Sequence, residues 1–321
     1  MAVRDPRCGP LPLWARLARG GQVGALRHPG RGALSAGDPV IITLHGRAED
    51  LPFELAADCA ALICDPPYSA YVHANMRSVC SPLNGRETRA RNIGFAALSP
   101  SLRGAIARCA GAVRRWSAVF ADVEGAAAWR EALEPGAEYV RAVPWVRWSQ
   151  PQTSGDRPPS GCELVLLAHR ADLGAGCRPR PRRKRWSGPG NLTHFDAKAL
   201  RGGGKHPTEK PLDLMLSLVA YLTDPGETVL DVCAGAGTTG QACRLLDRSA
   251  VLVEQSAEWA AAAEARVDAP LTDAELERVR RWVAAHRVLL AAPLYPGAEQ
   301  AAEDRRARLA ADVERAARWL A

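Results

Sequence analysis

The sequence predicts an α/β fold built on a parallel sheet, and three observations lead to that prediction. Apolar runs at 40–44 and 60–64 are separated by a stretch long enough for a crossover between parallel strands. Residues 228–254 have the pattern of a strand, a glycine-rich turn, a helix and a second strand, which is one βαβ unit. Two segments with helical apolar spacing after residue 270 predict a C-terminal helical hairpin packed on this domain.

Composition limits the class of protein. With 321 residues, 47% of them hydrophobic, the chain can bury one large core. It has no apolar run long enough to span a membrane and no signal-peptide-like N-terminus, so we expect a cytoplasmic protein. Nine cysteines without a C-x-x-C pair, and histidines outside any ligand pattern, predict reduced thiols and no metal site. The formal net charge of +7 predicts a polyanionic partner.

The first half of the chain is predicted to alternate strands and helices. Residues 1–36, rich in Gly, Pro, Arg and Ala, are expected to form a poorly ordered extension. The predicted strands or extended segments are 40–44, 60–64, 119–120, 139–148 and 164–168. The predicted helices are 126–133 and 100–115, the latter with Ser99 as N-cap and Pro100 at the first position. The polar stretch 69–99 is long for a structureless loop, which predicts a lid or a binding loop.

The second half carries the clearer helical signals. Lys210-Pro211 opens a helix whose apolar residues share one face, namely Leu212, Met215, Leu216, Val219 and Leu222. Thr272 and Glu275 form a capping box for the first helix of the C-terminal hairpin. We therefore expect three parts, an N-terminal extension at 1–36, a domain at 37–270 with an insertion near 171–204, and a helical extension at 271–321.

The strongest candidate for a functional site is the turn Asp65-Pro66-Pro67-Tyr68. It follows the predicted buried strand at 60–64. Two consecutive prolines fix the backbone and remove two N–H donors, which leaves carbonyl groups without a ladder partner. Asp65 adds a carboxylate and Tyr68 a flat aromatic face. Such a pocket suits a planar group that bears an NH2, for instance the exocyclic amine of a nucleobase turned out of its stack. The same residues also fit a proline-rich β-turn in which Asp65 caps its own backbone.

The glycine-rich turn allows two kinds of cofactor. Gly235, Gly237 and Gly240 form G-x-G-x-x-G, and Glu254 ends the next strand 19 residues after the first glycine. This pattern fits a dinucleotide, and hence a nicotinamide- or flavin-dependent oxidoreductase, but the same geometry also binds S-adenosylmethionine. Asp231 lies four residues before Gly235, where it would repel a pyrophosphate and suit an ammonium or sulfonium group. The residues therefore favour the sulfonium cofactor.

A basic segment at 178–186 has the sequence RPRPRRKRW. Its prolines forbid a helix, so we expect a loop that lays cations on DNA phosphates and leaves the tryptophan free to wedge or stack. The alternative is a solvated basic loop without a ligand. The candidate DNA-binding residues are Arg178, Arg180, Arg182, Arg183, Lys184, Arg185 and Trp186.

The order of these motifs resembles that of amino-group DNA methyltransferases of the permuted, or beta, class. In that family the D-P-P-Y strand precedes a target-recognition segment, and the cofactor loop comes last, opened by a Lys-Pro helix. Here Asp65 to Tyr68, residues 171–204, Lys210-Pro211 and Asp231 to Glu254 follow in that order. Residues 145–169 resemble a segment of phage and prophage members. Where the family usually has Pro-Phe after the acid of the cofactor strand, this chain has Val232-Cys233.

The resemblance, which covers roughly residues 38–270, implies a Rossmann-like S-adenosylmethionine-dependent methyltransferase fold with a permuted motif order. It implies site-specific methylation of the exocyclic N6 of adenine in double-stranded DNA, by base flipping and direct in-line transfer. The implied catalytic residues are Asp65, Pro66, Pro67 and Tyr68. Asp65 and the Pro66 carbonyl would accept the hydrogens of the amine, and Tyr68 would stack on the base. The implied cofactor-binding residues are Lys210, Asp231, Ala234, Gly235, Gly237, Thr238, Thr239 and Glu254.

Alternatives stay open within and outside this family. D-P-P-Y is commoner in adenine-N6 enzymes and S-P-P-Y in cytosine-N4 enzymes, but an aspartate at this position could serve either amine. An inactive DNA-binding relative is disfavoured by the intact Asp65, Tyr68, Asp231 and Glu254, and an oxidoreductase would leave D-P-P-Y without a role. The resemblance implies DNA as a partner and a location at the nucleoid, and it allows a homodimer and a cognate restriction endonuclease.

Overall fold

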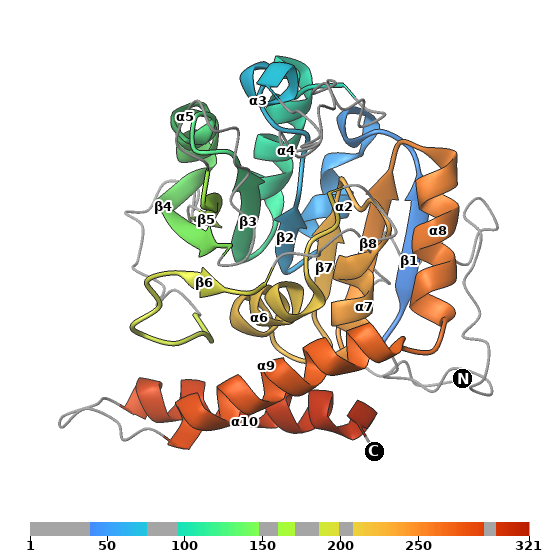
Figure 1. Cartoon of the computed structure of the whole chain (residues 1–321). Coiled ribbons are helices and arrows are strands. Elements are labelled where there is room, and N and C mark those ends of the chain that lie inside the picture. The colour runs from blue at the N-terminus through green and yellow to red at the C-terminus, as the bar shows by residue number, and fades with distance from the viewer. Residues whose placement is uncertain are drawn as a thin grey trace, which may run out of the picture.

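The computed structural model describes residues 39–75, 96–147, 160–170, 186–198, 208–291 and 300–320. These residues form an eight-stranded sheet that carries helices on both faces, and two long C-terminal helices lie beneath it in the view of Figure 1. The N-terminal extension expected at 1–36 and the basic residues 178–185 lie outside the described part of the chain.

All but one of the strands occur where the sequence predicts a strand or an extended segment, and the short strand at 195–196 is not predicted. They are β1 (Ile41–His45), β2 (Ala61–Cys64), β3 (Trp116–Ala121), β4 (Ala137–Val146), β5 (Cys162–Arg170), β6 (Phe195–Asp196), β7 (Thr228–Asp231) and β8 (Ser249–Glu254). Their order in the sheet is β1-β8-β7-β2-β3-β5-β4-β6.

The sheet is mixed, which corrects the expectation of a parallel one. Strand β5 runs antiparallel to both of its neighbours, β3 and β4, while the other neighbouring pairs are parallel. Strands β4 and β5 are consecutive in the chain and adjacent in the sheet, so β5 returns directly beside β4 in the opposite direction. The first residues of β5 therefore lie at the same edge as the last residues of β3.

Helices separate most of the strands, and only helices follow β8 in the described part of the chain. They are α2 (Phe53–Ala57), α3 (Ala70–Asn75), α4 (Pro100–Ala112), α5 (Ala126–Leu133), α6 (Leu212–Leu222), α7 (Thr238–Leu245), α8 (Ala257–Asp268), α9 (Asp273–Ala291) and α10 (Gln300–Ala317). Short 3-10 turns are η1 (Ala48–Asp50), η3 (Glu134–Gly136) and η4 (Arg318–Leu320). Helix α8, an alanine-rich segment with weak periodicity, is a feature that the sequence analysis did not predict.

Capping side chains fix several helix ends. The Ser99 hydroxyl accepts from the Leu102 N–H at 3.1 Å, which confirms the predicted start of α4. The helix ends at Ala112 rather than near residue 115, because the N–H groups of Arg114 and Arg115 already bond to carbonyls beside β2. At α9 the capping box is formed as predicted, with the Glu275 N–H donating to Thr272 and the Thr272 N–H to the Glu275 carboxylate.

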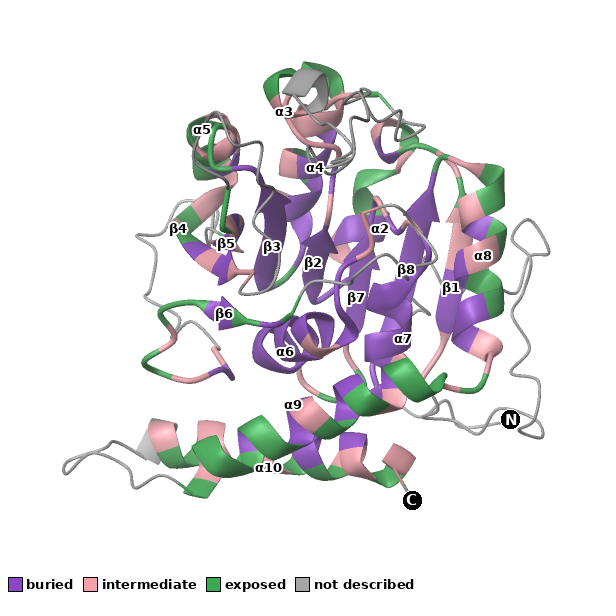
Figure 2. Cartoon of the chain, in the orientation of Figure 1, coloured by how far each residue is buried: buried purple, intermediate pink, exposed green. Residues whose placement is uncertain are grey.

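Alternating side chains divide the core into two layers, one on each face of the sheet. In β2, Ile63 packs with α6 and α7, whereas Leu62 packs with α2 and α4. Figure 2 shows the central strands and helices α6 and α7 in the colour of buried residues, while the outward faces of α8 and α9 are exposed. The central strands are therefore buried on both faces, as their continuous apolar runs require.

The connections create a switch point between β2 and β7. After β7 the chain moves to β8 on one side, whereas after β2 it moves to β3 on the other side. In open α/β sheets ligands bind outside the carboxyl ends of the strands at such a point. The turn after β2 and the glycine-rich loop after β7 open from neighbouring strands at this edge.

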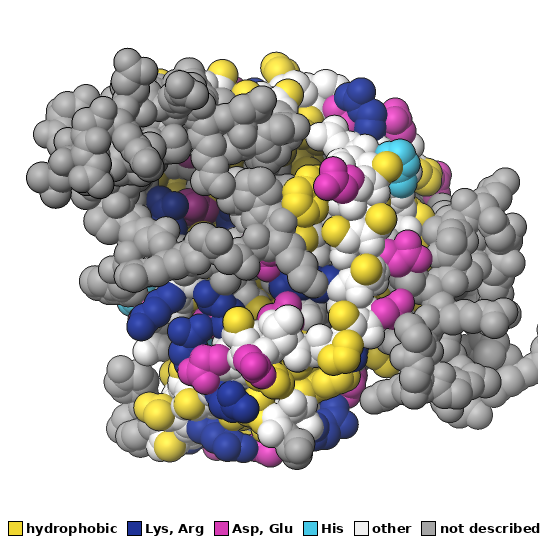
Figure 3. Space-filling view, turned by 45° about the vertical axis from the view of Figure 1, so that its right-hand side comes forward, with side chains coloured by type: hydrophobic (Ala, Val, Ile, Leu, Met, Phe, Trp, Pro, Cys, Tyr) yellow, Lys and Arg dark blue, Asp and Glu magenta, His cyan; other side chains and the backbone are white. Residues whose placement is uncertain are grey.

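Two surface features concern possible partners. Within the described ranges, no helix combines the length and apolar character needed to cross a membrane. In Figure 3, acidic and basic side chains are interspersed over the lower part of the molecule, where the C-terminal helices lie. The described surface in that region is therefore not a uniformly basic patch.

Candidate active site

The carboxyl ends of three neighbouring strands bring acidic residues together. Asp65 follows β2, Asp231 ends β7 and Glu254 ends β8. Asp231 and Glu254 are buried, and Asp65 retains 20% of its side-chain exposure. The sequence-predicted catalytic turn and cofactor loop are thus adjacent, although 166 residues separate the two aspartates in the chain.

Lys210 lies against the D-P-P-Y turn. Its Nζ is 2.6 Å from Asp65 Oδ2 and 3.4 Å from Glu163 Oε2. The ammonium also lies 5.3 Å from the Tyr68 ring centroid and 5.0 Å from that of Phe120. The resemblance assigns Lys210 to the cofactor, and the structure places its ammonium beside the D-P-P-Y turn.

The two oxygens of Asp65 have different surroundings. Oδ2 accepts from Lys210, whereas Oδ1 is buried and has no hydrogen-bond partner among the described residues. Burial raises the pKa of Asp65 to about 6, because the pull of Lys210 in the opposite direction is weaker and Glu163 adds a like charge. The turn therefore holds one paired acceptor and one acceptor that still needs a donor.

Tyr68 is fixed at its hydroxyl end. The O–H donates to Glu163 Oε2, and the ring packs against the core below the sheet edge. Pro66 is buried, and the Tyr68 carbonyl accepts from the Leu98 N–H at 3.0 Å. Ser69 then closes the turn, since its hydroxyl donates to Asp122, which follows β3, at 2.6 Å.

Glu163 and Arg147 are site residues that the sequence analysis missed. Arg147 Nη1 lies 2.9 Å from Glu163 Oε1, on the side away from Lys210. Burial alone would raise the pKa of Glu163, but Lys210 and Arg147 lower it, and the net direction is downward. A buried acid just before the apolar run 164–168 is an available sequence signal, but its partners come from distant segments.

The glycine loop is held by its own carboxylates. Glu254 accepts from the Gly235 N–H at 2.8 Å and from the Ser256 N–H at 2.9 Å. Asp231 accepts from the Cys233 N–H at 3.0 Å and from the Thr239 hydroxyl at 2.5 Å. These bonds fix the loop before any ligand arrives.

Glycine is required at two loop positions. Gly235 and Gly237 have φ values of +50° and +79°, the left-handed region that side chains disfavour. A Cβ on Gly237 would lie 2.9 Å from the Cα of Ala263 in α8, and one on Gly240 would lie 2.7 Å from Leu252 in β8. The predicted G-x-G-x-x-G pattern thus also serves close packing of α7 on its neighbours.

Two further residues assigned to the cofactor have internal contacts. The Thr238 hydroxyl accepts from Arg266 at 3.0 Å, and the Ala234 N–H donates to the Val253 carbonyl at 3.1 Å. Both residues are buried in the loop. Thr238 lies at the start of α7 and Ala234 lies beside β8, so both side chains pack inward and the loop would present its backbone to a ligand.

Negative charge dominates this loop. Burial raises the pKa of Asp231 to about 7, although Thr239 and Cys233 bond to the carboxylate, and the nearby charges of Asp65 and Glu254 raise it further. Such surroundings favour a cationic ligand and disfavour a pyrophosphate. Across the described residues, no group of three or more His, Cys, Asp or Glu side chains could hold a metal ion.

Trp186 is part of the fold, which corrects the expectation of a free side chain. Its ring packs at 5.4 Å from Trp116 and 5.7 Å from Tyr221, and Nε1 donates to the Pro189 carbonyl at 3.0 Å. The physical reason is that the indole fills the gap between β3 and α6, where its N–H also finds a partner. The cations Arg178 to Arg185 lie outside the described residues.

Comparison with known proteins finds DNA methyltransferases over part of the chain. Residues 177–265 match a family model for N6- and N4-type enzymes, described as DNA methylase. Over 56 residues the chain is 45% identical to the type II methyltransferase M2.MboI of Moraxella bovis, a segment that is 17% of this chain and 20% of that protein. The resemblance to amino-group DNA methyltransferases is confirmed by these matches.

A second curated relative and a solved structure are also similar to this chain. The type II methyltransferase M2.DpnII of Streptococcus pneumoniae is 34% identical over 80 residues, which are 25% of this chain and 29% of that protein. The chain thus spans less than a third of the length of the curated relatives that it matches. Among solved structures, the M1.HpyAVI–SAM complex is 23% identical with a TM-score of 0.49, over 72% of this chain and 100% of that one.

Proposed function

We propose that this protein is a DNA methyltransferase that moves a methyl group from S-adenosylmethionine to the exocyclic N6 of adenine. The observation that carries the proposal is Asp65 Oδ1, a buried acceptor without a donor among the described residues, at the switch point of the sheet. An exocyclic amine supplies the missing N–H. The family match over residues 177–265 supports the same reaction class.

The residues of the D-P-P-Y turn would act on the amine directly. The lone pair of an aromatic amine is delocalised into the ring, so the nitrogen is a poor nucleophile. Asp65 Oδ1 and the Pro66 carbonyl would accept its two hydrogens, which favours a tetrahedral nitrogen with a free lone pair. Tyr68 would stack on the flipped base and offset part of the unstacking cost of a few kcal/mol.

The cofactor-binding assignment rests on charge and on the loop. When bound, S-adenosylmethionine supplies an electrophilic methyl group on a sulfonium centre. Glu254 would accept hydrogen bonds from ribose hydroxyls, because its oxygens have lone pairs beyond the two used by the loop. Asp231 would add favourable charge for the cation, and Gly235 and Gly237 would let the backbone approach it.

Asp65 is also the group that would take up a proton. The amine nitrogen must lose one hydrogen after it gains the methyl group, and Oδ1 is the acceptor that already bonds to it. A pKa of about 6 suits this step, since the carboxylate is ionised at neutral pH and still basic enough to bind a proton. Lys210 would then balance the remaining charge of the site.

Double-stranded DNA is the proposed partner, at the nucleoid in the cytoplasm. Residues 171–204 would form the recognition segment, with Arg178 to Arg185 on phosphates. Two relatives bear the name type II methyltransferase, so a cognate restriction endonuclease is part of the proposal. Both relatives are matched over short segments, so the basic residues of 171–204 are the main support for DNA as the partner.

The test is methyl transfer from labelled S-adenosylmethionine to unmethylated genomic DNA, followed by nucleoside digestion and mass analysis, with Asp65→Ala as control. We expect N6-methyladenine from the wild type and none from the variant. N4-methylcytosine would overturn the choice of adenine while keeping the reaction class. Unlabelled DNA from a folded protein would overturn the proposed function.

A further inference from the structure

Glu163 occupies a place that the proposed reaction does not yet use. It is the second residue of β5, the strand that runs against its neighbours, so it lies at the edge where β2 and β3 end. Its residue exposure is 9%, and its carboxylate touches three functional groups. These groups come from three separate segments of the chain.

The contacts divide between the two oxygens of Glu163. Oε2 accepts from the Tyr68 hydroxyl and lies 3.4 Å from Lys210 Nζ. Oε1 pairs with Arg147 at 2.9 Å, and Arg147 also donates to the Ser160 carbonyl at 3.3 Å. Glu163 is therefore held from behind by Arg147 and presents Oε2 to the catalytic turn.

We propose that Glu163 is a positioning residue, a role that rests on the proposed function. It orients the Tyr68 ring and shares the Lys210 ammonium with Asp65. A tyrosine that donates to a fixed carboxylate has one preferred ring orientation, as base stacking requires. An ammonium held between two carboxylates cannot move onto Asp65 Oδ1, so that oxygen stays open for the target amine. Glu163 itself does not touch the reacting atoms.

The first readout is the titration of Asp65, followed by the 13C signal of its labelled carboxyl group and assigned with Asp65→Asn. The charged or titratable groups that face Asp65 are Lys210, Glu163, Tyr68, Asp231 and the thiols of Cys64 and Cys233. Glu163→Gln removes a like charge and leaves Lys210 to Asp65 alone, so we expect the Asp65 pKa to fall below that of the wild type. An unchanged titration would overturn the shared-ammonium part of the proposal. This readout does not depend on methyl transfer, so it stands apart from failure of the proposed function.

The second readout is the rate of methyl transfer to genomic DNA. Loss of a charged hydrogen-bond acceptor is expected to lower the rate by about tenfold to a hundredfold in Glu163→Gln. In a Tyr68→Phe background the same change should cost clearly less, because the hydroxyl that Glu163 orients is gone. Equal losses in both backgrounds would overturn the proposal. Glu134→Gln, which alters an exposed pair with Arg130, is the matched control and should keep the wild-type rate.

Glu163→Asp gives an independent check if Glu163→Gln does not fold. The shorter side chain keeps the negative charge but withdraws it from the Tyr68 hydroxyl. We expect the transfer rate to fall as in Glu163→Gln while the Asp65 titration stays closer to that of the wild type. A wild-type rate in Glu163→Asp would contradict the orienting role.

Discussion

At the scale of single residues, two aspartates with raised pKa values have different surroundings. Asp65 faces a cation and keeps one oxygen without a donor among the described residues, whereas Asp231 uses both oxygens within its own loop. Burial is the leading cause of both shifts. The first arrangement suits chemistry on a donor, and the second holds the glycine-rich loop in shape.

The Asp65 carboxylate predicts an acidic limit to activity. Since only the ionised carboxylate can take up the proton that the amine loses, the single-turnover rate should fall about tenfold for each pH unit below a pKa of about 6. The profile is measured with cofactor bound and DNA in excess. A rate that stays constant down to pH 5 in a protein that remains folded would contradict the role of Asp65.

Asp231 predicts a pH dependence of stability. A carboxyl group whose pKa rises from 3.8 to about 7 on folding binds its proton more tightly in the folded state. Its contribution to the free energy of unfolding is therefore fully present below about pH 4 and is lost as pH rises towards 7, on the order of 4 kcal/mol. Urea unfolding of the cofactor-free protein at several pH values should show this loss in the wild type and a smaller loss in Asp231→Asn, where Asp65 with its pKa of about 6 still contributes. The exposed Asp196→Asn should behave as the wild type.

At the scale of elements, the side chain of Arg266 joins three parts of the site. From α8 it pairs with Glu209 at 2.7 Å and Glu275 at 2.8 Å, and it donates to Thr238 at 3.0 Å. Glu209 precedes Lys210, Thr238 begins α7, and Glu275 caps α9. One guanidinium therefore holds the glycine-rich loop, the Lys210 segment and the first C-terminal helix together.

Arg266→Met should destabilise the protein strongly. The change leaves buried or partly buried carboxylates without their cation, so we expect a loss of about 3–5 kcal/mol in the free energy of unfolding. Arg280→Met is the control, because Arg280 is 54% exposed and pairs loosely with Glu277. Urea unfolding of both variants gives the comparison. Equal stability of the two variants would show that Arg266 does not hold these elements.

The elements also show what the sequence can predict. The βαβ unit at 228–254, the Ser99 cap and the Thr272 capping box are local patterns, and each forms as predicted. The antiparallel direction of β5 depends on which strands it pairs with, and the apolar periodicity of the sequence does not reveal these partners. Three further features likewise depend on residues far apart in the chain. They are the contact of Lys210 with Asp65, the contact of Glu163 with Tyr68 and the burial of Trp186.

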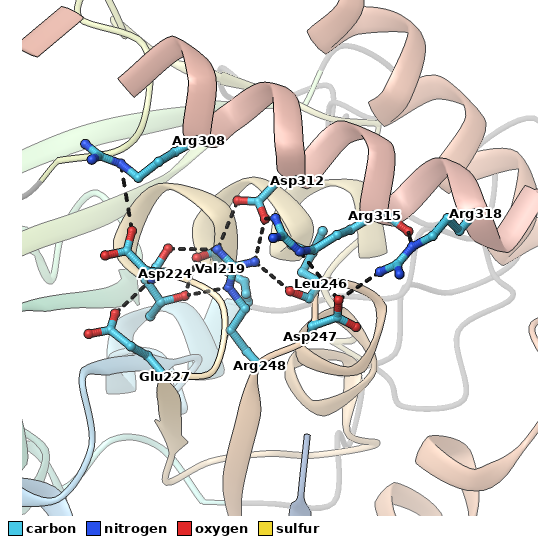
Figure 4. Close-up of polar contacts among 11 residues, drawn as sticks. Val219, Asp224, Glu227, Leu246, Asp247, Arg248, Arg308, Asp312, Arg315 and Arg318 are labelled. Carbon is cyan, nitrogen blue, oxygen red and sulfur yellow. Dashed lines mark hydrogen bonds and ion pairs between the residues drawn. The ribbon is translucent and has the colours of Figure 1, made fainter. Parts of the chain in front are cut away.

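At the scale of the whole molecule, a buried ion pair fastens the C-terminal hairpin to the sheet domain. Figure 4 shows Arg248, which precedes β8, facing Asp312 of α10, with distances of 2.5 and 2.9 Å between their paired atoms. Arg248 is fully buried and also donates to the carbonyls of Leu246 and Thr223. The same close-up shows Arg315 and Arg318 reaching Asp247.

Asp312→Ala should therefore release α10. The variant leaves the Arg248 charge buried without its partner, which costs about 3–5 kcal/mol. We expect faster amide hydrogen exchange across α10 than in the wild type, and an increase that is smaller across the central strands. Glu314→Gln, which alters an exposed pair with Arg287, should leave the exchange unchanged. Wild-type protection of α10 in Asp312→Ala would show that apolar packing alone holds the hairpin.

The central claim is that Asp65 acts on the target amine rather than on the cofactor, and the single-turnover rate of Asp65→Asn tests it most directly. Asparagine keeps the size of the side chain but replaces an acceptor by a donor. The rate of transfer to DNA should fall by at least about a hundredfold, with S-adenosylmethionine affinity by calorimetry close to that of the wild type. A wild-type rate, or a loss explained entirely by weaker cofactor binding, would contradict the account.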